Sequence, residues 1–178
     1  MAAVCLVIRR LTKADHARSL QVIRKSFATV ARQFGLSRKN APTHPSLLTA
    51  ERFREMAARP VTLFGAFVAR EQVGFAALER ADRGVYYLER LSVLPKYRHR
   101  GYGCRLVDRA VAFARARGGT SVDTGLIDRH TVLKQWYAAQ GFVETGTKDY
   151  PHLPFTVCFM RRELRAPPVQ PGADPSSA

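Results

Sequence analysis

The chain has 178 residues, 46% of them hydrophobic, and this length fits one domain with a core of ordinary size plus a tail. Lys and Arg total 29 while Asp and Glu total 14, which gives a formal net charge of +15. The positive charge favours anionic partners such as polyphosphates, acidic surfaces or nucleic acid, but it does not choose among them. A compositional bias toward Ala and Arg is the alternative explanation.

Three cysteines, Cys5, Cys104 and Cys158, lie far apart and include no Cys-x-x-Cys pair. They argue against a disulfide framework or a zinc site, so we expect no metal, and free thiols suit a reducing compartment. The apolar N-terminus, residues 1–8, is too short for the hydrophobic region of a signal peptide. No stretch approaches the roughly 18 apolar residues of a membrane span. We therefore expect a cytoplasmic protein that does not bind membranes.

The first part of the chain predicts a strand and two helices. Residues 2–10 are strand-like, and Thr12 with Asp15 forms a capping-box pattern ahead of a helical repeat over residues 17–27. The segment 34–48 reads as a loop because it is rich in Gly, Asn, Pro and Ser. A short helix over residues 49–58 follows, with Thr49 as its N-cap.

Three strands are expected next, at residues 61–69, 72–79 and 85–93. Arg70-Glu71 forms the first turn between them, and residues 81–84 form the second. A loop at 95–100 then leads into a helix over 101–117, which Gly118-Gly119 ends. The apolar positions of this helix recur with a period near 3.6: Gly103, Leu106, Val107, Ala110, Val111 and Ala114.

The last part predicts a strand at 121–127, a helix at 128–140 that Gly141 stops, and strands at 142–145 and 155–160. Residues 166–178 are rich in Pro, Ser and Ala, and we expect a disordered tail there. The order of elements predicts one α/β domain over residues 1–165. Its sheet should be mixed and largely antiparallel, with about seven strands and about four helices.

A basic loop with two glycines joins a strand to an amphipathic helix in residues 91–107 (LSVLPKYRHRGYGCRLV). Gly101 and Gly103 allow backbone N–H groups to close on a phosphate, and the helix N-terminus adds partial positive charge. Arg98 and Arg100 add full charges that suit a diphosphate and a ribose phosphate. The glycine spacing fits neither a dinucleotide fingerprint nor a P-loop. A basic turn before a surface helix is the alternative interpretation.

These residues resemble the GNAT superfamily of acetyltransferases. Its signature, Arg/Gln-x-x-Gly-x-Gly/Ala, corresponds to residues 98–103 (RHRGYG). Residues 88–95 (LERLSVLP) look like the family's fourth strand, and 136–142 (WYAAQGF) look like its Leu-Tyr-x-x-x-Gly-Phe ending. The resemblance covers about residues 4–164, and residues 34–46 and 153–160 look more narrowly like a bacterial subgroup. It implies the GNAT acyl-CoA N-acyltransferase fold, with acetyl-CoA as co-substrate.

The resemblance also implies where CoA binds, because the family holds the pantetheine arm between its splayed fourth and fifth strands. Backbone groups of Leu91, Ser92 and Val93 would pair with the arm. The pyrophosphate would lie on the backbone of the loop: Arg98, His99, Arg100, Gly101, Tyr102, Gly103 and Cys104. His130 stands where the family commonly has an Asn that contacts the arm. A capping or surface role for His130 is the alternative.

Two residues are candidates for the chemistry. By resemblance, Tyr137 lies near the sulfur and protonates the leaving thiolate, a role that suits a weak acid; a tyrosine packed by its ring is the alternative. Glu89 is the candidate base, because strand alternation places it on one face with Leu91 and Val93, where desolvation favours proton uptake. A water relay, an ion pair with a neighbouring Arg, or a group that only binds the amine's positive charge are the alternatives for Glu89.

Three further residues are candidate contacts for the acceptor. His44, Tyr150 and His152 lie in the two loops that border the acceptor pocket in the family. Histidines flanked by proline also stabilise turns, which is the alternative role.

The resemblance predicts an enzyme that moves acetyl from acetyl-CoA to a primary amine of a small molecule or peptide, by direct attack in a ternary complex. Cys104 belongs to the loop, which disfavours an acetyl-cysteine intermediate. A non-catalytic acyl-CoA sensor is one rival, and the presence of both Glu89 and Tyr137 argues against it. A nucleic-acid- or ribosome-associated protein is another, although the aromatics do not interleave with the Arg runs. Dimers are common among proteins resembling this one, so a homodimer is an open alternative to a monomer.

Overall fold

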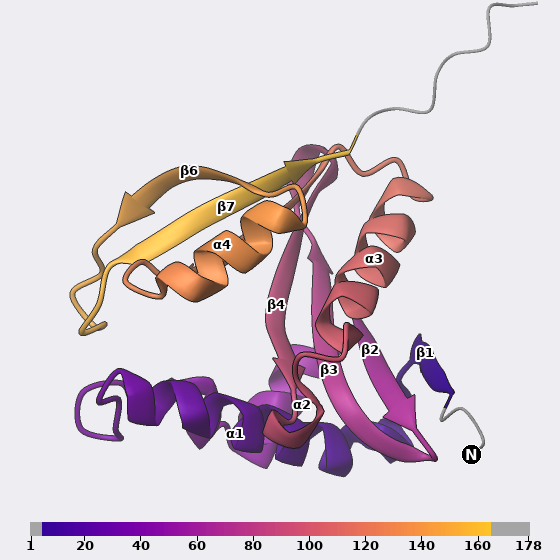
Figure 1. Ribbon diagram of the computed structural model, residues 1–178, viewed down its shortest axis with the longest axis horizontal. Helices are drawn as coiled ribbons and strands as arrows, with labels where there is room; N and C mark the ends of the chain where they lie inside the picture. The colour runs from indigo at the N-terminus through magenta and orange to yellow at the C-terminus, as the bar shows by residue number, and fades with distance from the viewer. Residues whose placement is uncertain (1–4, 165–178) are drawn as a thin grey trace, which may run out of the picture.

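A computed structural model describes residues 5–164 as an open seven-stranded sheet with four α-helices (Figure 1). The strand order is β1-β2-β3-β4-β5-β7-β6, and every neighbouring pair is antiparallel except β4 and β5. The predicted mixed, largely antiparallel α/β fold is therefore confirmed. The expected tail at 166–178 lies outside the described residues. Within 5–164, no helix has the length and apolarity needed to cross a bilayer.

The strands are β1 Leu6–Arg10, β2 Val61–Val68, β3 Glu71–Arg80, β4 Val85–Val93, β5 Ser121–Ile127, β6 Val143–Lys148 and β7 Val157–Glu163. The helices are α1 His16–Gln33, α2 Ala50–Ala58, α3 Tyr102–Arg115 and α4 Thr131–Ala139. Short 3-10 turns at Lys13–Asp15, Pro45–Leu47, Asp82–Gly84 and Pro95–Tyr97 connect them.

Thr12 caps the 3-10 turn Lys13–Asp15 that leads into α1, and Thr49 caps α2. The Asp15 carboxylate accepts the backbone N–H of Thr12 at 2.8 Å, and the Thr49 hydroxyl accepts the N–H of Arg52 at 3.2 Å. Helix α1 runs beyond its predicted end because the buried face continues to Ala31.

The β2–β3 turn consists of Ala69 and Arg70, one residue earlier than predicted, since Val68 pairs with Glu71. Both turn residues have left-handed φ values, 46° and 67°. This mirror-image turn matches the twist of a hairpin, and glycine usually supplies it. No glycine marks it here, so the sequence pattern did not reveal its position.

Helices cover both faces of the sheet, with α1 and α2 on one face and α3 on the other (Figure 1). The five larger apolar residues predicted for α3 are all buried against β2, β3 and β4. On the opposite face, Ile23 of α1 and Phe53 of α2 pack with Phe75 of β3. The sheet therefore separates two hydrophobic cores. Because both faces are covered, a ligand can reach the sheet only at its edges or where its strands separate.

A β-bulge at Arg90 interrupts the pairing of β3 with β4. Phe75 pairs with Ser92 and Ala77 pairs with Glu89, so two residues of β4 lie opposite one residue of β3. Arg90 has a left-handed φ of 51°, as in the bulge type that normally carries glycine at this position.

The bulge reverses the side-chain alternation of β4. Leu91 and Val93 pack against the core on the α3 face. Glu89 lies opposite Ala77, which faces the α1 and α2 core. The prediction that Glu89 shares a face with Leu91 and Val93 is therefore wrong, because the extra residue shifts the period-2 pattern by one.

Leu106→Ala is expected to lower the free energy of unfolding by about 2–5 kcal/mol, because the side chain is fully buried against Gly74 of the sheet. Urea unfolding followed by circular dichroism measures the change. Asp108→Ala on the exposed side of α3 is the control, and should stay within about 0.5 kcal/mol of the parent protein. Equal losses in the two variants would contradict this packing.

Candidate active site

Strands β4 and β5 pair over only three residues each, and this short pairing opens the sheet. Residues 85–87 of β4 lie beside 121–123 of β5, after which the two parallel strands diverge. Immediately beyond the last pair, the Thr124 hydroxyl donates to the Leu88 carbonyl at 3.0 Å. The rest of β4 therefore presents a backbone edge that no other strand covers.

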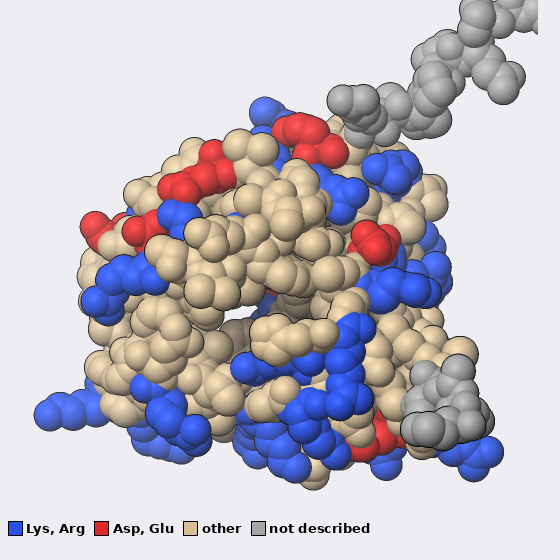
Figure 2. Space-filling view, in the orientation of Figure 1, with Lys and Arg blue, Asp and Glu red and all other residues tan. Residues whose placement is uncertain are grey.

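A cavity of about 830 Å³ occupies this opening. Its walls come from α1, the segment at residues 44–45, β4, β5, α4, β7 with the segment before it, and the loop that leads into the first turn of α3. Figure 2 shows it as a hollow at the centre of one face, with Lys and Arg side chains gathered along its lower side. The volume lies near the upper end of the roughly 300–1,000 Å³ range of small-molecule sites.

The glycine loop forms one side of the cavity, and its backbone is bent in the manner of an anion-binding loop. His99 and Gly101 have left-handed φ values of 60° and 78°. A Cβ at Gly101 would meet no atom within 4 Å, so backbone conformation requires the glycine, not lack of space. Gly101 is followed at once by the first turn of α3, whose N–H groups have no helical acceptor.

Gly103 is needed for a different reason. A Cβ at this position would lie 3.2 Å from Cζ2 of Trp136 in α4. The glycine therefore lets α4 approach the start of α3 closely, and this contact closes one wall of the cavity.

The side chain of Arg98 serves the protein's own backbone. Its Nε donates to the Val93 carbonyl at 3.1 Å and a terminal nitrogen donates to the Ser26 carbonyl at 2.8 Å. Burial lowers the pKa of Arg98. The guanidinium thus connects the loop to β4 and to α1, while exposed Arg100 lies over the Tyr97 ring. Of the two predicted phosphate charges, Arg100 is the more accessible.

Tyr137 lies in the cavity wall and is almost completely buried, with 4% of its surface exposed. Its ring packs edge-on against Trp136 and Phe142, at centroid distances of 5.0 and 5.2 Å. Desolvation raises the pKa of Tyr137 to about 12, and the neighbouring Thr124 hydroxyl opposes the shift. The phenol is therefore neutral near pH 7 and able to donate a hydrogen bond.

Glu89 also lines the cavity, and it is ion-paired. Its Oε2 accepts from Arg59 at 3.0 Å and from Arg90 at 2.9 Å. Arg59 in turn contacts Glu79 at 3.0 Å. The Nε of Arg90 is buried and has no partner among the described residues. Glu89 therefore forms the ion pair with neighbouring arginines that was predicted from the sequence as an alternative role. Both contacts use Oε2, and neither uses Oε1.

His130 caps α4, since its Nδ1 accepts the N–H of Leu133 at 3.4 Å. Helix α4 begins at Thr131 instead of residue 128, because the N–H of Asp128 still donates to the Thr156 carbonyl beside β7. The His130 ring lies 5.2 Å from that of Phe34, and burial lowers its pKa. The residue lines the cavity as well, so the capping role does not exclude a ligand contact.

Of the three residues predicted to contact the acceptor, only His44 lines the cavity. His44 lines the cavity, is 8% exposed, and its ring lies 5.7 Å from that of Phe27. Burial lowers the pKa of His44, and its Nδ1 accepts the N–H of Ser46. Tyr150 and His152 contact each other, with rings 5.7 Å apart, but neither lines the cavity.

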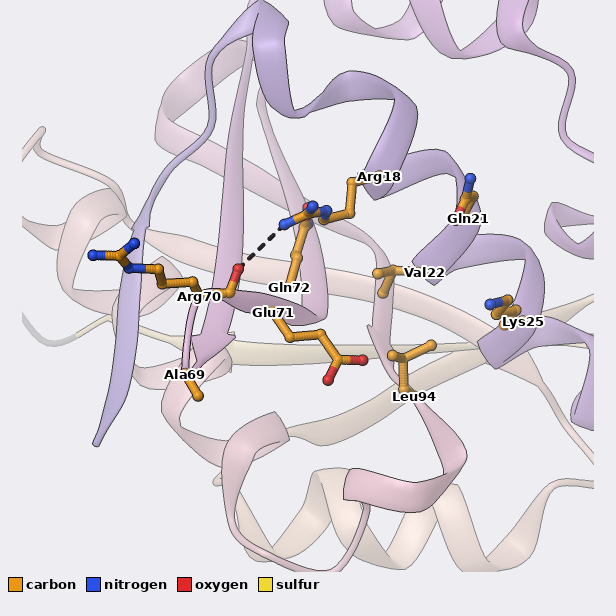
Figure 3. A pocket seen from close by; sticks show the side chains of 9 residues that line it. All are labelled: Arg18, Gln21, Val22, Lys25, Ala69, Arg70, Glu71, Gln72 and Leu94. Atoms are coloured by element: carbon orange, nitrogen blue, oxygen red, sulfur yellow. Dashed lines mark hydrogen bonds between the residues drawn. The ribbon is translucent and has the colours of Figure 1, made fainter. Parts of the chain in front are cut away.

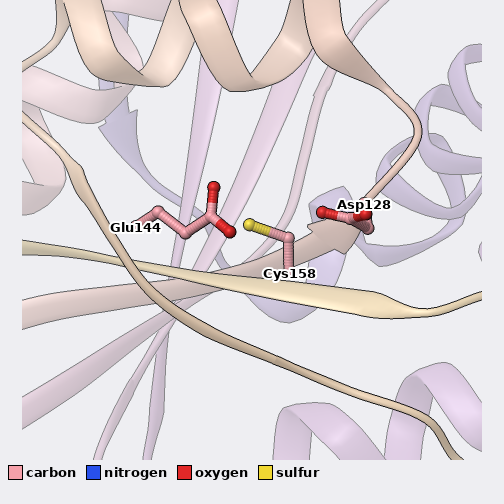
Figure 4. A group of neighbouring side chains, drawn as sticks. All are labelled: Asp128, Glu144 and Cys158. Atoms are coloured by element: carbon pink, nitrogen blue, oxygen red, sulfur yellow. The ribbon is translucent and has the colours of Figure 1, made fainter.

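Asp128, Glu144 and Cys158 bring three potential metal ligands within 4.8 Å of one another (Figure 4). Lys134 already serves this group, because its ammonium donates to Asp128 at 2.9 Å and to Glu144 at 2.8 Å. A cation would have to displace the ammonium from both carboxylates. The arrangement fixes α4 to β5 and β6, and the expectation of no metal stays a prediction.

A smaller cavity of about 430 Å³ lies between α1 and the β2–β3 turn (Figure 3). Arg18 donates to the Arg70 carbonyl at 3.2 Å across it. Glu71 at its rim accepts the Tyr97 hydroxyl at 2.6 Å and pairs with Lys96 at 3.3 Å. Its lining includes neither the glycine loop nor Glu89 or Tyr137, all of which line the larger cavity, so the larger cavity is the candidate active site.

Sequence reasoning missed several residues of this cavity. Thr124, which holds the point of divergence, and Trp136, which fits against Gly103, were not singled out. Trp136 adjoins Tyr137 in the family-like ending, and that position was the available signal. The aromatic residues Phe27, Phe155 and Phe159 carried no motif, since only the fold brings them to one cavity.

Residues 62–144 match the profile of the family described as "Acetyltransferase (GNAT) domain". A search of the curated proteins gave no match. The solved structure of the ribosomal-protein-S18-alanine N-acetyltransferase from Escherichia coli is similar, with a TM-score of 0.73 and 13% identity over 98% of this chain and 99% of that chain.

Two other solved structures are similar. The PaiA N-acetyltransferase from Thermoplasma acidophilum, in complex with coenzyme A, has a TM-score of 0.67 and 20% identity over 90% of this chain and 99% of that chain. A GNAT-family acetyltransferase from Staphylococcus aureus has a TM-score of 0.69 and 19% identity over 90% of this chain and 100% of that chain. Residues 62–144 therefore match a GNAT acetyltransferase domain, and the chain as a whole shares the fold of these solved structures.

Proposed function

We propose that the protein transfers an acetyl group from acetyl-CoA to a primary amine by direct attack in a ternary complex. One observation carries the proposal: a neutral, buried tyrosine and a glycine loop face the same cavity, where β4 and β5 diverge. The match of residues 62–144 to the GNAT acetyltransferase domain supports acetyl-CoA as the donor.

The cavity fits CoA in two respects. The backbone of Leu91, Ser92 and Val93 is on the uncovered edge of β4, where an extended amide-containing arm could pair as a strand does. The bent loop at residues 98–104 and the start of α3 offer N–H groups and positive charge to a diphosphate. His130 is near enough to the cavity to contact the arm, in addition to capping α4.

Tyr137 is the proposed general acid. As the amine nitrogen forms a bond to the acetyl carbon, the bond from that carbon to sulfur breaks and sulfur gains negative charge. A buried phenol stabilises the developing charge by donating a hydrogen bond and then its proton. Its raised pKa does not preclude the transfer, because the same dry surroundings also raise the proton affinity of a thiolate formed there.

The base is Glu89 or a water molecule that relays the proton. The amine must lose one proton before or during attack, and Glu89 is the single carboxylate in the cavity wall among residues 5–164. Both guanidinium contacts use Oε2, so Oε1 is the oxygen that would accept the proton.

Two rival functions are less well supported. A sensor that binds acyl-CoA without turnover has no need for a buried phenol and a carboxylate in the same cavity. For nucleic acid, the charge of +15 is the sole argument. Free thiols at Cys5, Cys104 and Cys158 support a reducing compartment such as the cytoplasm. The homodimer stays a prediction.

Release of free thiol from acetyl-CoA in the presence of a library of amines, with mass detection of N-acetyl products, tests the proposal directly. Thiol release that depends on an amine and yields its acetylated form supports an enzyme. CoA binding measured by calorimetry without any amine-dependent release would favour the sensor.

Gly103→Val is expected to weaken CoA binding at least about tenfold, because a branched side chain at a 3.2 Å contact pushes Trp136 and α4 away from the start of α3. Titration calorimetry with CoA measures the affinity, and thermal unfolding checks that the variant is folded. Ala112→Val on the exposed side of α3 introduces the same side chain away from the cavity and should bind CoA normally. Unchanged affinity in Gly103→Val would refute the role of this contact.

Tyr137→Phe is expected to lower kcat more than tenfold with little change in the KM for acetyl-CoA, because it removes the donated proton but keeps the ring. Steady-state kinetics with the best amine from the library provide both constants. Tyr86→Phe is a matched control, since Tyr86 is equally buried in β4 but lies outside the cavity wall. An undiminished kcat in Tyr137→Phe would remove the phenol from the mechanism.

Glu89→Gln separates the two candidate bases through the pH dependence of kcat/KM. If Glu89 is the base, the rise of activity with pH that reports its deprotonation is expected to disappear, and kcat falls at least about tenfold. Glu79→Gln is the control, because Glu79 shares the Arg59 contact but does not line the cavity. A pH profile that matches the parent enzyme would leave Glu89 as a binding group and favour the water relay.

A further inference from the structure

Aromatic and aliphatic side chains line much of the cavity beyond the residues proposed for CoA. Phe27 comes from α1, Tyr87 from β4, and Phe155 and Phe159 from β7 and the segment before it. The three phenylalanines are half-buried, so part of each residue is accessible to solvent. Three separate elements therefore contribute apolar surface to one cavity.

This apolar surface is unusual for the molecule. In the described part of the chain, four large hydrophobic side chains are strongly exposed: Val7, Tyr87, Val132 and Val143. Tyr87, which is 42% exposed, and Val132, which is 70% exposed, both line the cavity. Exposed apolar surface that gathers in a concave site indicates a ligand that covers it.

The charges of the cavity exclude an acceptor with several positive charges. Glu89 is its single carboxylate within the described residues, whereas Arg90 and Arg98 are both in the lining. His44 adds no negative charge, and burial lowers its pKa, which keeps the ring neutral near pH 7. A polyamine or aminosugar needs several carboxylates, and here it would meet guanidinium groups instead.

We propose that the acceptor is a primary amine with one positive charge, carried on an apolar body the size of a ring or a short alkyl chain. This inference rests on the proposed function and names the substrate class of the same site. The ammonium binds Oε1 of Glu89 before it loses its proton, while Arg59 and Arg90 hold the carboxylate through Oε2. The apolar body lies against Tyr87, Phe27 and Phe159.

Two kinds of acceptor carry one ammonium group on an apolar body. One is a small arylalkyl or alkyl amine, and the other is the N-terminus of a peptide whose first side chain is apolar. Both present an ammonium next to an apolar group. A peptide also places its backbone in the mouth of the cavity. The two kinds of acceptor therefore differ in how the activity depends on the length of the peptide chain attached to the amine.

Two matched pairs of amines test the class with acetyl-CoA at a fixed concentration. Phenethylamine against ethylamine varies the apolar body at constant charge, and hexylamine against 1,6-diaminohexane varies the charge at constant chain length. We expect kcat/KM to favour the first member of each pair at least about tenfold. A Phe-Gly-Gly peptide beside phenethylamine distinguishes a peptide acceptor from a small amine. Equal or reversed preferences in either pair would overturn the inference.

Variants connect the preference to the cavity. Phe159→Ala and Tyr87→Ala are each expected to reduce the preference for phenethylamine over ethylamine at least about threefold, with the KM for acetyl-CoA unchanged. Tyr87→Ala should fold normally because the side chain is largely exposed. Val143→Ala in β6 removes a comparable exposed side chain elsewhere and should keep the preference. A preference that survives both cavity variants would place the apolar body in another part of the molecule.

Binding measured without turnover separates failure of the substrate class from failure of the proposed enzyme. Calorimetric titration of phenethylamine and of ethylamine into the CoA-saturated protein reports recognition alone. Tighter binding of phenethylamine without acetylation would support the inference and refute catalysis. Acetylation of polar or multiply charged amines with no preference for apolar ones would refute the inference and support catalysis.

Discussion

The short parallel pairing of β4 with β5 is the constraint on which the site depends. Three paired residues on each strand join the two halves of the sheet, and beyond them the strands diverge. A fully paired sheet would have no room for a ligand, and two separate sheets would not hold their walls in register. The Thr124 hydroxyl satisfies the first carbonyl that loses its strand partner, so the divergence begins without an unpaired buried acceptor.

The two halves supply different chemistry to the opening. The half built from β5, β7 and α4 brings the phenol of Tyr137, whose pKa is raised because burial removes water from around it. The half built from β4 and α1 brings the ion-paired Glu89 together with Phe27 and Tyr87, and Phe159 of β7 faces the same cavity from the other half. The glycine loop lies at the junction. The match of residues 62–144 to a GNAT acetyltransferase domain is consistent with the proposal that acetyl-CoA and an amine share this opening.

Much of the fold could be predicted from periodicity alone. The bounds of β4 and β5 agree with prediction residue for residue, and the apolar face of α3 is the buried face. The bulge at Arg90 could not be predicted, because a two-against-one pairing depends on the partner strand, and it moved Glu89 to the other face. The loop residues around Gly101 could be identified because the left-handed φ of this position favours glycine, and the glycine is visible in the sequence. The aromatic residues that line the cavity could not be identified, since they come from segments that are far apart in the sequence.

The bridging guanidinium of Arg98 has a consequence for the thermodynamics of ligand binding. It joins the glycine loop to the carbonyl of Ser26, which precedes Phe27 in α1 and lines the same cavity. The conformational entropy of ordering this loop is thus lost when the chain folds, and little of it remains to be lost when a ligand arrives. Arg98 therefore fixes the loop relative to both β4 and α1 before any ligand binds, through its hydrogen bonds to the carbonyls of Val93 and Ser26.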